Sequence, residues 1–330
     1  MGEKMRILII RLSSIGDVIL TTPILKKLKE KNKNLKIDFV VLDKFKDSIV
    51  GNPNIDNLII FKKDTDDGVK NIRRFSKILK ENNYDYVFDL HSKIRSRLIT
   101  FFLGEKTFRY IKRSLYKTIL VKSGLIKYRA DNTIVKNYFN AFKVLGINYN
   151  GENIEFNFSK NDEKKVKNYK NYVVFAPGAS KNTKKWTVEG FGKLAKLIKE
   201  RYQIEIILIG SSKEKGECEE INKKSGNICI NLAGELSLKE SGALLSKANF
   251  LVTNDSGPFH IGRGVKTKSY VIFGPTDPNM FEYDELGVLI YGNEPCSPCS
   301  LHGDKKCPKE HFNCMKNISA EDIMERIEKK

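Results

Sequence analysis

Residues 253–260 (TNDSGPFH) combine residue types that can bind a phosphate. Asp255 and Ser256 follow an apolar run and precede Gly257 and a proline, and His260 lies just beyond them. Asp or Ser before a proline is typical of a helix N-terminus, where free backbone N–H groups and the positive end of the helix dipole attract anions. We therefore expect a phosphate-binding loop in the C-terminal half. The simpler alternative is an ordinary strand–loop–helix connection in which Asp255 only caps the helix.

Residues 177–186 (PGASKNTKKW) form a second candidate loop. They place the hydroxyl of Ser180 a few residues before Lys184 and Lys185. A lysine beside a phosphate-binding loop can neutralise a diphosphate leaving group, although both lysines could instead be solvated charges. Trp186 is the only tryptophan of the chain, and its expected role is to pack the loop or the following helix.

Residues 10–18 (IRLSSIGDV) place a carboxylate, Asp17, close to Ser13 and Ser14. Asp17 could be a general base, with the two serines as donors to it or to a substrate, or it could complement the dipole of a following helix. From spacing alone the helix role is favoured. The segment is not GxGxxG, which argues against a nicotinamide dehydrogenase. No second carboxylate is fixed beside Asp17, so a glycosidase pair is not indicated, and the chain has neither G-x-S-x-G nor a P-loop.

Strand and helix patterns alternate along the chain and predict α/β architecture. Buried parallel strands are predicted at 7–10, 37–42, 58–61, 86–90, 172–176, 204–209, 249–252 and 269–273. Helices are predicted at 18–31, 69–82, 133–145, 188–201, 238–247 and 319–328. A polar stretch near residues 151–172 divides the pattern into two doubly wound, Rossmann-like domains, 1–160 and 161–330, the second with the terminal helix. Ligands bind at the carboxyl ends of such strands, so the three loops are expected to line a cleft between the halves.

Composition limits the classes of partner. The 330 residues include 40% hydrophobic and 30% charged residues and carry a formal net charge of +19. No apolar run approaches the roughly 18 residues of a membrane span, and the N-terminus does not resemble a secretory signal, so we expect a cytoplasmic protein. The positive charge fits an anionic substrate or membrane surface. The chain lacks basic motifs interleaved with aromatic residues, so no nucleic-acid partner is expected.

Four of the six cysteines cluster near the C-terminus: Cys296, Cys299, Cys307 and Cys314. The first two have the CxxC spacing of a structural zinc site, and His302 and His311 lie among the four. The second pair is not CxxC, so reduced thiols that pack a loop, or a disulfide, remain alternatives. The isolated Cys218 and Cys229 are expected to be inert in a reducing compartment.

Taken together, these segments resemble the ADP-heptose:lipopolysaccharide heptosyltransferases of glycosyltransferase family 9. The resemblance covers nearly the whole chain and depends on four segments in this order: IRLSSIGDV (10–18), FAPGAS (175–180) with KKW (184–186), NDSG (254–257) with His260, and FGPTDP (273–278). It implies a GT-B fold, in which two Rossmann-like domains face each other across a cleft. It further implies inverting transfer of heptose from ADP-heptose to the lipopolysaccharide inner core, with no cofactor required for catalysis.

The resemblance also assigns roles to residues of this sequence. Asp17 matches the general base, which becomes its favoured role. The positions that match donor-binding residues are Ser180, Lys184, Asp255, Ser256, Gly257 and His260. The acceptor side is less specific, and its candidates by position and charge are Ser13, Ser14, Lys93, Arg95, Arg97 and Arg113. The implied partners are ADP-heptose, an anionic core acceptor and a peripheral contact at the cytoplasmic face of the inner membrane. Two other hypotheses remain: a transferase of the same fold with another nucleotide-sugar or acceptor, and a non-catalytic basic binding protein.

Overall fold

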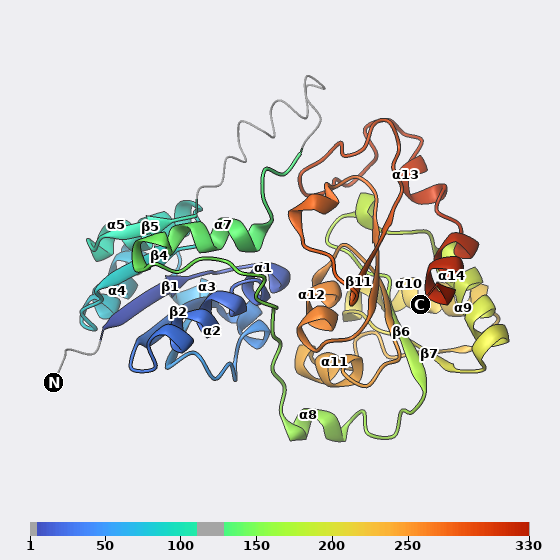
Figure 1. Ribbon diagram of the computed structural model, residues 1–330, viewed down its shortest axis with the longest axis horizontal. Helices are drawn as coiled ribbons and strands as arrows, with labels where there is room; N and C mark the ends of the chain where they lie inside the picture. Colours follow the sequence, from blue (N-terminus) through green and yellow to red (C-terminus); the bar gives the residue numbers. More distant parts are fainter. Residues whose placement is uncertain (1–4, 111–128, 330) are drawn as a thin grey trace. The chain divides into compact units, whose positions relative to one another are not determined.

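The computed structural model describes residues 5–110 and 129–329 (Figure 1), and Arg113 lies outside these ranges. The described residues divide into two compact units. The first comprises residues up to 110 together with 132–157, and the second comprises 129–131 together with 158–329. Every strand pairing in the described part of the chain is parallel. The predicted fold class, two doubly wound α/β sheets, is therefore confirmed.

The first unit contains a five-stranded sheet of order β3-β2-β1-β4-β5. Its strands are β1 (Arg6–Ile10), β2 (Lys36–Leu42), β3 (Asn57–Phe61), β4 (Tyr86–Asp89) and β5 (Thr107–Arg109). The central strand β1 is apolar along almost its whole length because helices cover both faces of a parallel sheet. Leu8 and Ile10 pack towards α4 (Val69–Lys80) and α5 (Ile94–Leu103), as members of one core cluster with Phe75 and Ile99.

The remaining helices of this unit are α1 (Ile15–Ile19), α2 (Thr22–Lys31), α3 (Lys63–Asp66) and α7 (Ile134–Ala141). The single helix predicted over residues 18–31 is wrong, because two helices, α1 and α2, occupy this region. Pro23 has no N–H to donate to Ile19, so a continuous helix would lose a hydrogen bond there. The hydroxyl of Thr22 donates to the Ile19 carbonyl instead, at 2.8 Å.

The second unit contains a six-stranded sheet of order β11-β10-β9-β6-β7-β8. Its strands are β6 (Tyr172–Ala176), β7 (Glu205–Leu208), β8 (Cys229–Asn231), β9 (Leu251–Asn254), β10 (Ser269–Phe273) and β11 (Gly287–Tyr291). The edge strands β5, β8 and β11 of the two sheets were not predicted. β5 and β8 have only three residues each, too few to show a periodic pattern.

Helices cover both faces of the second sheet (Figure 1). One face packs against α9 (Val188–Tyr202), α10 (Lys215–Ser225) and α14 (Ala320–Glu328), whose apolar residues share one core cluster. The other face carries α11 (Leu238–Leu245) and α12 (Gly257–Gly264). The short helices α8 (Lys160–Lys164) and α13 (Asn313–Lys316) complete the unit. No helix in the described ranges is long and apolar enough to cross a membrane.

Candidate active site

Each sheet has one point at which the strand order reverses. In the first unit the chain runs from β1 to β2 and β3 on one side and then returns to β4 on the other side of β1. In the second unit it runs from β6 to β7 and β8 and returns to β9 on the other side of β6. Such switch points, at the carboxyl ends of the strands, are where open α/β sheets bind ligands. The segments that follow β1, β6 and β9 are the three singled out from the sequence.

Asp17 lies in the first turn of α1, at the switch point of the first unit. Its Oδ2 atom accepts hydrogen bonds from the backbone N–H of Ser14 at 3.2 Å and from the Ser14 hydroxyl at 3.0 Å. Asp17 therefore does stabilise the start of the helix, the role that spacing alone favoured. Its side chain nevertheless remains 31% exposed, so the carboxylate is still accessible to a substrate. Ser13 is half-buried beside it.

Arg11 is the strongest partner of Asp17. Its Nη2 lies 2.6 Å from Asp17 Oδ2, while its other guanidinium nitrogen Nη1 donates to the Leu90 carbonyl at the end of β4. Burial acts to lower the pKa of Arg11, but the ion pair with Asp17 outweighs burial and leaves this pKa raised above its ordinary value. The guanidinium also lies over the ring of Tyr138, 5.4 Å from its centroid. Arg11 is thus a permanent cation that favours the ionised form of Asp17.

Tyr138 contributes a second contact to the same carboxylate. Its hydroxyl donates to Asp17 Oδ1 at 3.5 Å, a long hydrogen bond. Burial raises the pKa of Tyr138 well above its ordinary value, so the hydroxyl stays protonated and remains a donor. Tyr138 comes from α7, far from Asp17 in the sequence. An ionised carboxylate held by a guanidinium and two hydroxyls, yet open to solvent, can accept a proton from a bound hydroxyl group.

The described basic candidates for acceptor binding lie just before α5 or on it. Lys93 is exposed and precedes α5, and Arg97 is exposed on that helix. Arg95 instead forms an ion pair with Asp67, and this contact lowers the pKa of Asp67. Arg113 lies outside the described residues. The assignment of these basic residues to an acceptor remains a prediction.

In the second unit, Asn254 connects two loops that the sequence analysis treated separately. Its Oδ1 accepts the backbone N–H of Trp186 at 3.0 Å, and its amide donates to the carbonyl of Pro177. Trp186 in turn donates from its indole Nε1 to the carbonyl of Ile318 at 3.0 Å. These buried hydrogen bonds fix both ends of the 177–186 loop against the end of β9. The expected packing role of Trp186 is confirmed by its burial.

Lys184 and Asp255 form an ion pair with 2.6 Å between Lys184 Nζ and Asp255 Oδ2. Their side chains are 12% and 6% exposed, so little water screens the interaction. Thr276, which follows β10, donates from its hydroxyl to the same Oδ2 at 2.9 Å. Loops after three adjacent strands, β6, β9 and β10, therefore meet here. The neighbouring Lys185 pairs with Glu217 instead. The structure thus distinguishes the partners of the two lysines, which the sequence alone could not do.

The other predicted donor residues lie at the start of α12, within it, or in the loop after β6. Gly257 is the first residue of α12 and Ser256 precedes it, as predicted from the sequence. The hydroxyl of Ser256 lies 3.4 Å from that of Thr253. His260 is buried within α12, with its ring centroid 4.9 Å from that of Phe281. Ser180 is exposed in the loop after β6. The site therefore offers a helix N-terminus, hydroxyls and a lysine, a combination suited to a diphosphate.

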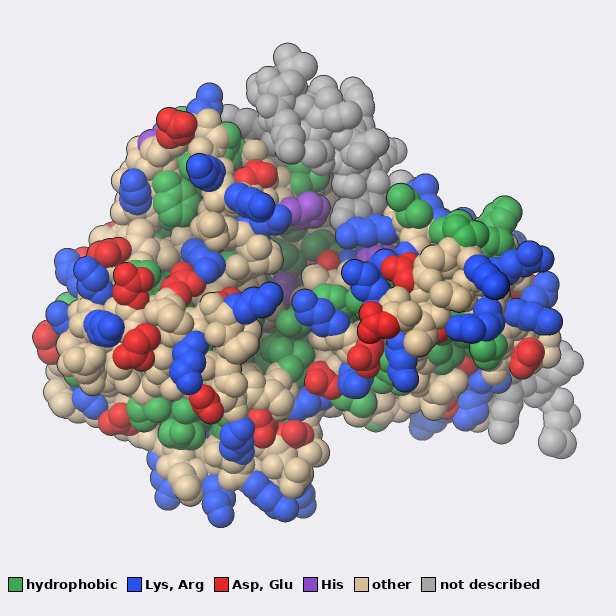
Figure 2. Space-filling model, turned by 180° about the vertical axis from the view of Figure 1, so that it is seen from behind, with side chains coloured by type: hydrophobic (Ala, Val, Ile, Leu, Met, Phe, Trp, Pro, Cys, Tyr) green, Lys and Arg blue, Asp and Glu red, His purple; other side chains and the backbone are tan. Residues whose placement is uncertain are grey.

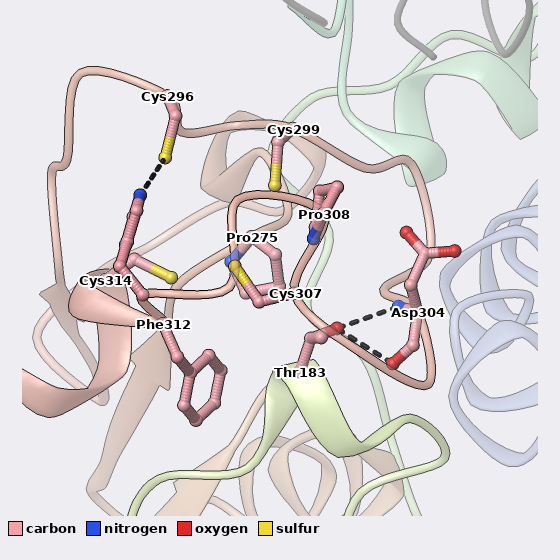
Figure 3. A pocket seen from close by; sticks show the side chains of 10 residues that line it. Thr183, Pro275, Cys296, Cys299, Asp304, Cys307, Pro308, Phe312 and Cys314 are labelled. Atoms are coloured by element: carbon pink, nitrogen blue, oxygen red, sulfur yellow. Dashed lines mark hydrogen bonds between the residues drawn. The ribbon is translucent and has the colours of Figure 1, made fainter.

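The four clustered cysteines line one pocket in the second unit, together with Asp304 and His311 (Figure 3). None of them forms a disulfide. Burial, with smaller contributions from neighbouring cysteines, raises the pKa of the Cys299 thiol to about 11 and that of Cys314 to about 12. Over residues 5–110 and 129–329, no three His, Cys, Asp or Glu side chains already meet as ligands of one ion.

Comparisons with known proteins identify the family of this chain. The profile of glycosyltransferase family 9 (heptosyltransferase) matches residues 72–312. The chain belongs to this family. The protein is therefore a glycosyltransferase, as the sequence motifs predicted.

Relatives of this family 9 glycosyltransferase cover almost its full length. It is 26% identical over 325 residues to lipooligosaccharide heptosyltransferase 2 of Campylobacter jejuni, covering 96% of each chain. A family 9 glycosyltransferase of Veillonella parvula has a TM-score of 0.82 at 20% identity, covering 99% of this chain and 97% of the other. The E. coli heptosyltransferase WaaC with ADP-2-deoxy-2-fluoro heptose has a TM-score of 0.68 at 20% identity, covering 98% and 99%. The predicted GT-B fold is thereby confirmed, while the arrangement of the two units across a cleft stays a prediction.

Sequence reasoning missed several residues of this family 9 glycosyltransferase site. Arg11, Asn254 and Thr276 all lie inside the quoted motifs but received no role. Each has a partner far away in the sequence that the strand order brings close: Leu90 for Arg11, Trp186 for Asn254 and Asp255 for Thr276. Asp89, at the end of β4, was also missed: it accepts hydrogen bonds from the backbone N–H of Ser92 at 2.8 Å and from the Ser96 hydroxyl at 3.1 Å. Burial raises its pKa.

Proposed function

We propose that this protein is a lipopolysaccharide heptosyltransferase that uses ADP-heptose and inverts the anomeric centre. Asp17 takes the proton from an acceptor hydroxyl while that oxygen attacks the anomeric carbon. The bond from this carbon to the diphosphate breaks, and ADP leaves. A single displacement of this kind inverts the configuration. The observation that carries the proposal is the partly exposed carboxylate of Asp17, paired with Arg11 at 2.6 Å.

The donor side of the proposal is supported by the ion pair between Lys184 and Asp255. A diphosphate that binds at the N-terminus of α12 would meet backbone N–H groups and the ammonium of Lys184. Lys184 then compensates the negative charge that develops on the departing ADP. Asp255, held by Thr276, remains able to accept hydrogen bonds from sugar hydroxyls. The identity of ADP-heptose as donor is supported by the family and by the E. coli relative solved with an ADP-heptose analogue.

The acceptor side is supported by family membership and by charge. The Campylobacter jejuni relative is named a lipooligosaccharide heptosyltransferase, and an inner-core acceptor is anionic. The chain carries a net charge of +19, which would concentrate such an acceptor near its surface. Catalysis by this route needs only the proton acceptor, the lysine and the helix N-terminus, so no cofactor is assigned to the reaction.

We further propose that α4 and α5 contact an anionic membrane surface. Ile94 and Phe101 are 80% and 73% exposed, and their spacing of seven residues places them on one face of α5. Arg97 lies on the same face, and neither helix contains an acidic residue. Figure 2 shows hydrophobic side chains next to Lys and Arg side chains on the first unit. Exposed apolar side chains among cations are typical of surfaces that bind anionic lipids.

The function is tested by assaying transfer with purified protein. ADP-heptose and a heptose-deficient core oligosaccharide should give ADP and an extended product, whose anomeric configuration NMR determines. A thermal-shift screen with ADP, UDP, GDP and CDP tests the donor separately, since a selective ligand raises the melting temperature. A selective rise with UDP, GDP or CDP would replace ADP-heptose by another nucleotide-sugar. Product of retained configuration would refute the single displacement.

Two further measurements test the remaining partners. Binding to anionic vesicles should fall about tenfold in an Ile94→Ser/Phe101→Ser double variant, because each apolar side chain contributes to insertion. Val144→Ser, at another exposed apolar position of the first unit, is the matched control and should bind as before. Equal binding to neutral and anionic vesicles would contradict the proposed surface. Steeply salt-dependent binding to nucleic acid without transferase activity would favour the basic binding protein.

A further inference from the structure

The loop between β11 and α13, residues 292–312, contains no helix or strand. Loops of this length without secondary structure are uncommon in compact domains and need another source of order. Here the described contacts include hydrogen bonds from the N–H groups of Cys299 and Ser300 to the carbonyl of Pro275, both 3.0 Å. A second tie joins Asp304 to Thr183, whose hydroxyl accepts the Asp304 N–H at 2.8 Å. The loop is thereby attached to the segments that follow β10 and β6.

The sulfur atoms of Cys296, Cys299, Cys307 and Cys314 face the space that this loop encloses (Figure 3). Cys296 and Cys299 belong to a CxxC turn that is attached to Pro275 through the Cys299 N–H. Cys314 lies in the first turn of α13, so a helix positions this cysteine separately from the CxxC turn. All four thiols are free. Four cysteine sulfurs around one pocket are the ligand set of closed, tetrahedral structural sites for zinc or iron.

His311 fits this set as a supporting residue and not as a ligand. Its Nδ1 atom accepts the backbone N–H of Asn313 at 3.0 Å, so in the neutral ring the proton resides on Nε2. Nε2 lies 3.7 Å from the sulfur of Cys296. The ring therefore donates towards that sulfur, as outer groups do around metal-bound thiolates. His302 is exposed and does not line the pocket.

We propose that these four cysteines together hold one structural transition-metal ion, zinc or iron. The sulfurs line the pocket without yet meeting at one point, so binding would draw them to about 2.3 Å from the ion. The loop can make this change because it has no helix or sheet hydrogen bonds of its own to break. The thiols release their protons to solvent as they become ligands, so binding weakens at low pH. No oxidation or reduction is involved.

Binding of this ion would also order the donor site. Asp304 contacts Thr183, the residue next to Lys184, and a side chain at Gly303 would collide with that of Lys184. The loop therefore lies directly against the segment that presents Lys184. Resting on the proposed function, the metal-bound protein should bind ADP more tightly than the metal-free protein.

The test is the metal content of the full-length protein purified under reducing conditions without an added chelator. Elemental mass spectrometry should find one zinc or iron ion per chain. Substituting any one of the four cysteines by Ala should lower the content at least about tenfold. Cys229→Ala is the matched control, because Cys229 is buried elsewhere in the same unit with Ser225 as its neighbour, and it should retain the metal.

A second readout does not depend on the variants folding. Adding Co²⁺ to chelator-treated wild-type protein should produce the absorption bands of a tetrahedral cobalt–thiolate site, and Zn²⁺ should abolish them. Wild-type protein without stoichiometric metal and without these bands would overturn the proposal, as would two disulfides among the four cysteines in freshly prepared protein. If the ion binds but the protein's affinity for ADP is unchanged, the metal site is supported and only its proposed effect on donor binding is contradicted.

Discussion

Replacing Asp17 with Asn tests the proposed chemistry most directly. The amide oxygen can still accept the Ser14 N–H, so the start of α1 is retained. The variant cannot act as a base and loses the charge that faces Arg11. Because general-base catalysis contributes about 10²–10⁴-fold, the turnover number should fall by at least about a hundredfold. ADP binding, which depends on residues of the second unit, should stay within a factor of about two.

The same substitution has a cost in stability that the structure allows us to bound. Removing one partner of a fully buried ion pair costs about 3–5 kcal/mol. Asp17 is 31% exposed and Arg11 keeps its hydrogen bond to the Leu90 carbonyl, so water and that carbonyl offset part of the loss. We expect the free energy of unfolding to fall by about 1–2 kcal/mol. The loss is measured by urea denaturation and turnover by continuous detection of released ADP.

Asp38→Asn is the matched control for this experiment. Asp38 pairs with Arg6 at 2.9 Å and accepts a hydrogen bond from Tyr84 at 2.7 Å, in the same sheet but towards the amino ends of the strands. The variant should lose at least as much stability as Asp17→Asn and keep its turnover. If Asp17→Asn retains more than about a tenth of wild-type turnover, Asp17 is not the base. If both variants lose turnover alike, the effect of Asp17→Asn comes from structure and not from proton transfer.

Three other outcomes follow from contacts in the structure. Lys184→Met should weaken ADP binding at least about tenfold, by calorimetry, because a charged hydrogen bond is lost, whereas Lys185→Met should leave it unchanged; equal effects would contradict the assignment. Trp186→Phe keeps an aromatic ring but leaves a buried carbonyl unpaired, so the free energy of unfolding in urea should fall by about 1–3 kcal/mol. Burial acts to raise the pKa of Asp56, but the hydrogen bonds from two lysines outweigh burial and lower this pKa to about 2. Because this pKa is lower in the folded state, the ionised carboxylate stabilises the fold above the unfolded-state pKa of about 4. This stabilisation is lost as the pH falls towards 2. Asp56→Asn should therefore destabilise by about 1 kcal/mol at pH 7, with the difference from wild type narrowing below pH 4; a difference independent of pH would refute the shift.

Some features of the site could be predicted because they are local. Asp17 in a first helical turn and Ser256 before the first turn of α12 follow from capping residues within a few positions of each other. The helix break before Pro23 has an equally local cause, although the periodic pattern concealed it. The edge strands β5 and β8 could not be predicted, because three residues carry no periodic signal and their pairing depends on a neighbouring strand.

The sequence by itself determined the alternating parallel sheets and the loops at their carboxyl ends. Continuous apolar runs are buried on both faces, and polar residues after them must lie at the sheet edge. Only the tertiary structure decided the partners: the Leu90 carbonyl for Arg11, and Asp255 for Lys184 in place of Lys185. The reason is that hydrophobic periodicity encodes burial but not strand order. The placement of β9 beside β6, and of β4 beside β1, brings groups that are far apart in the chain within hydrogen-bonding distance.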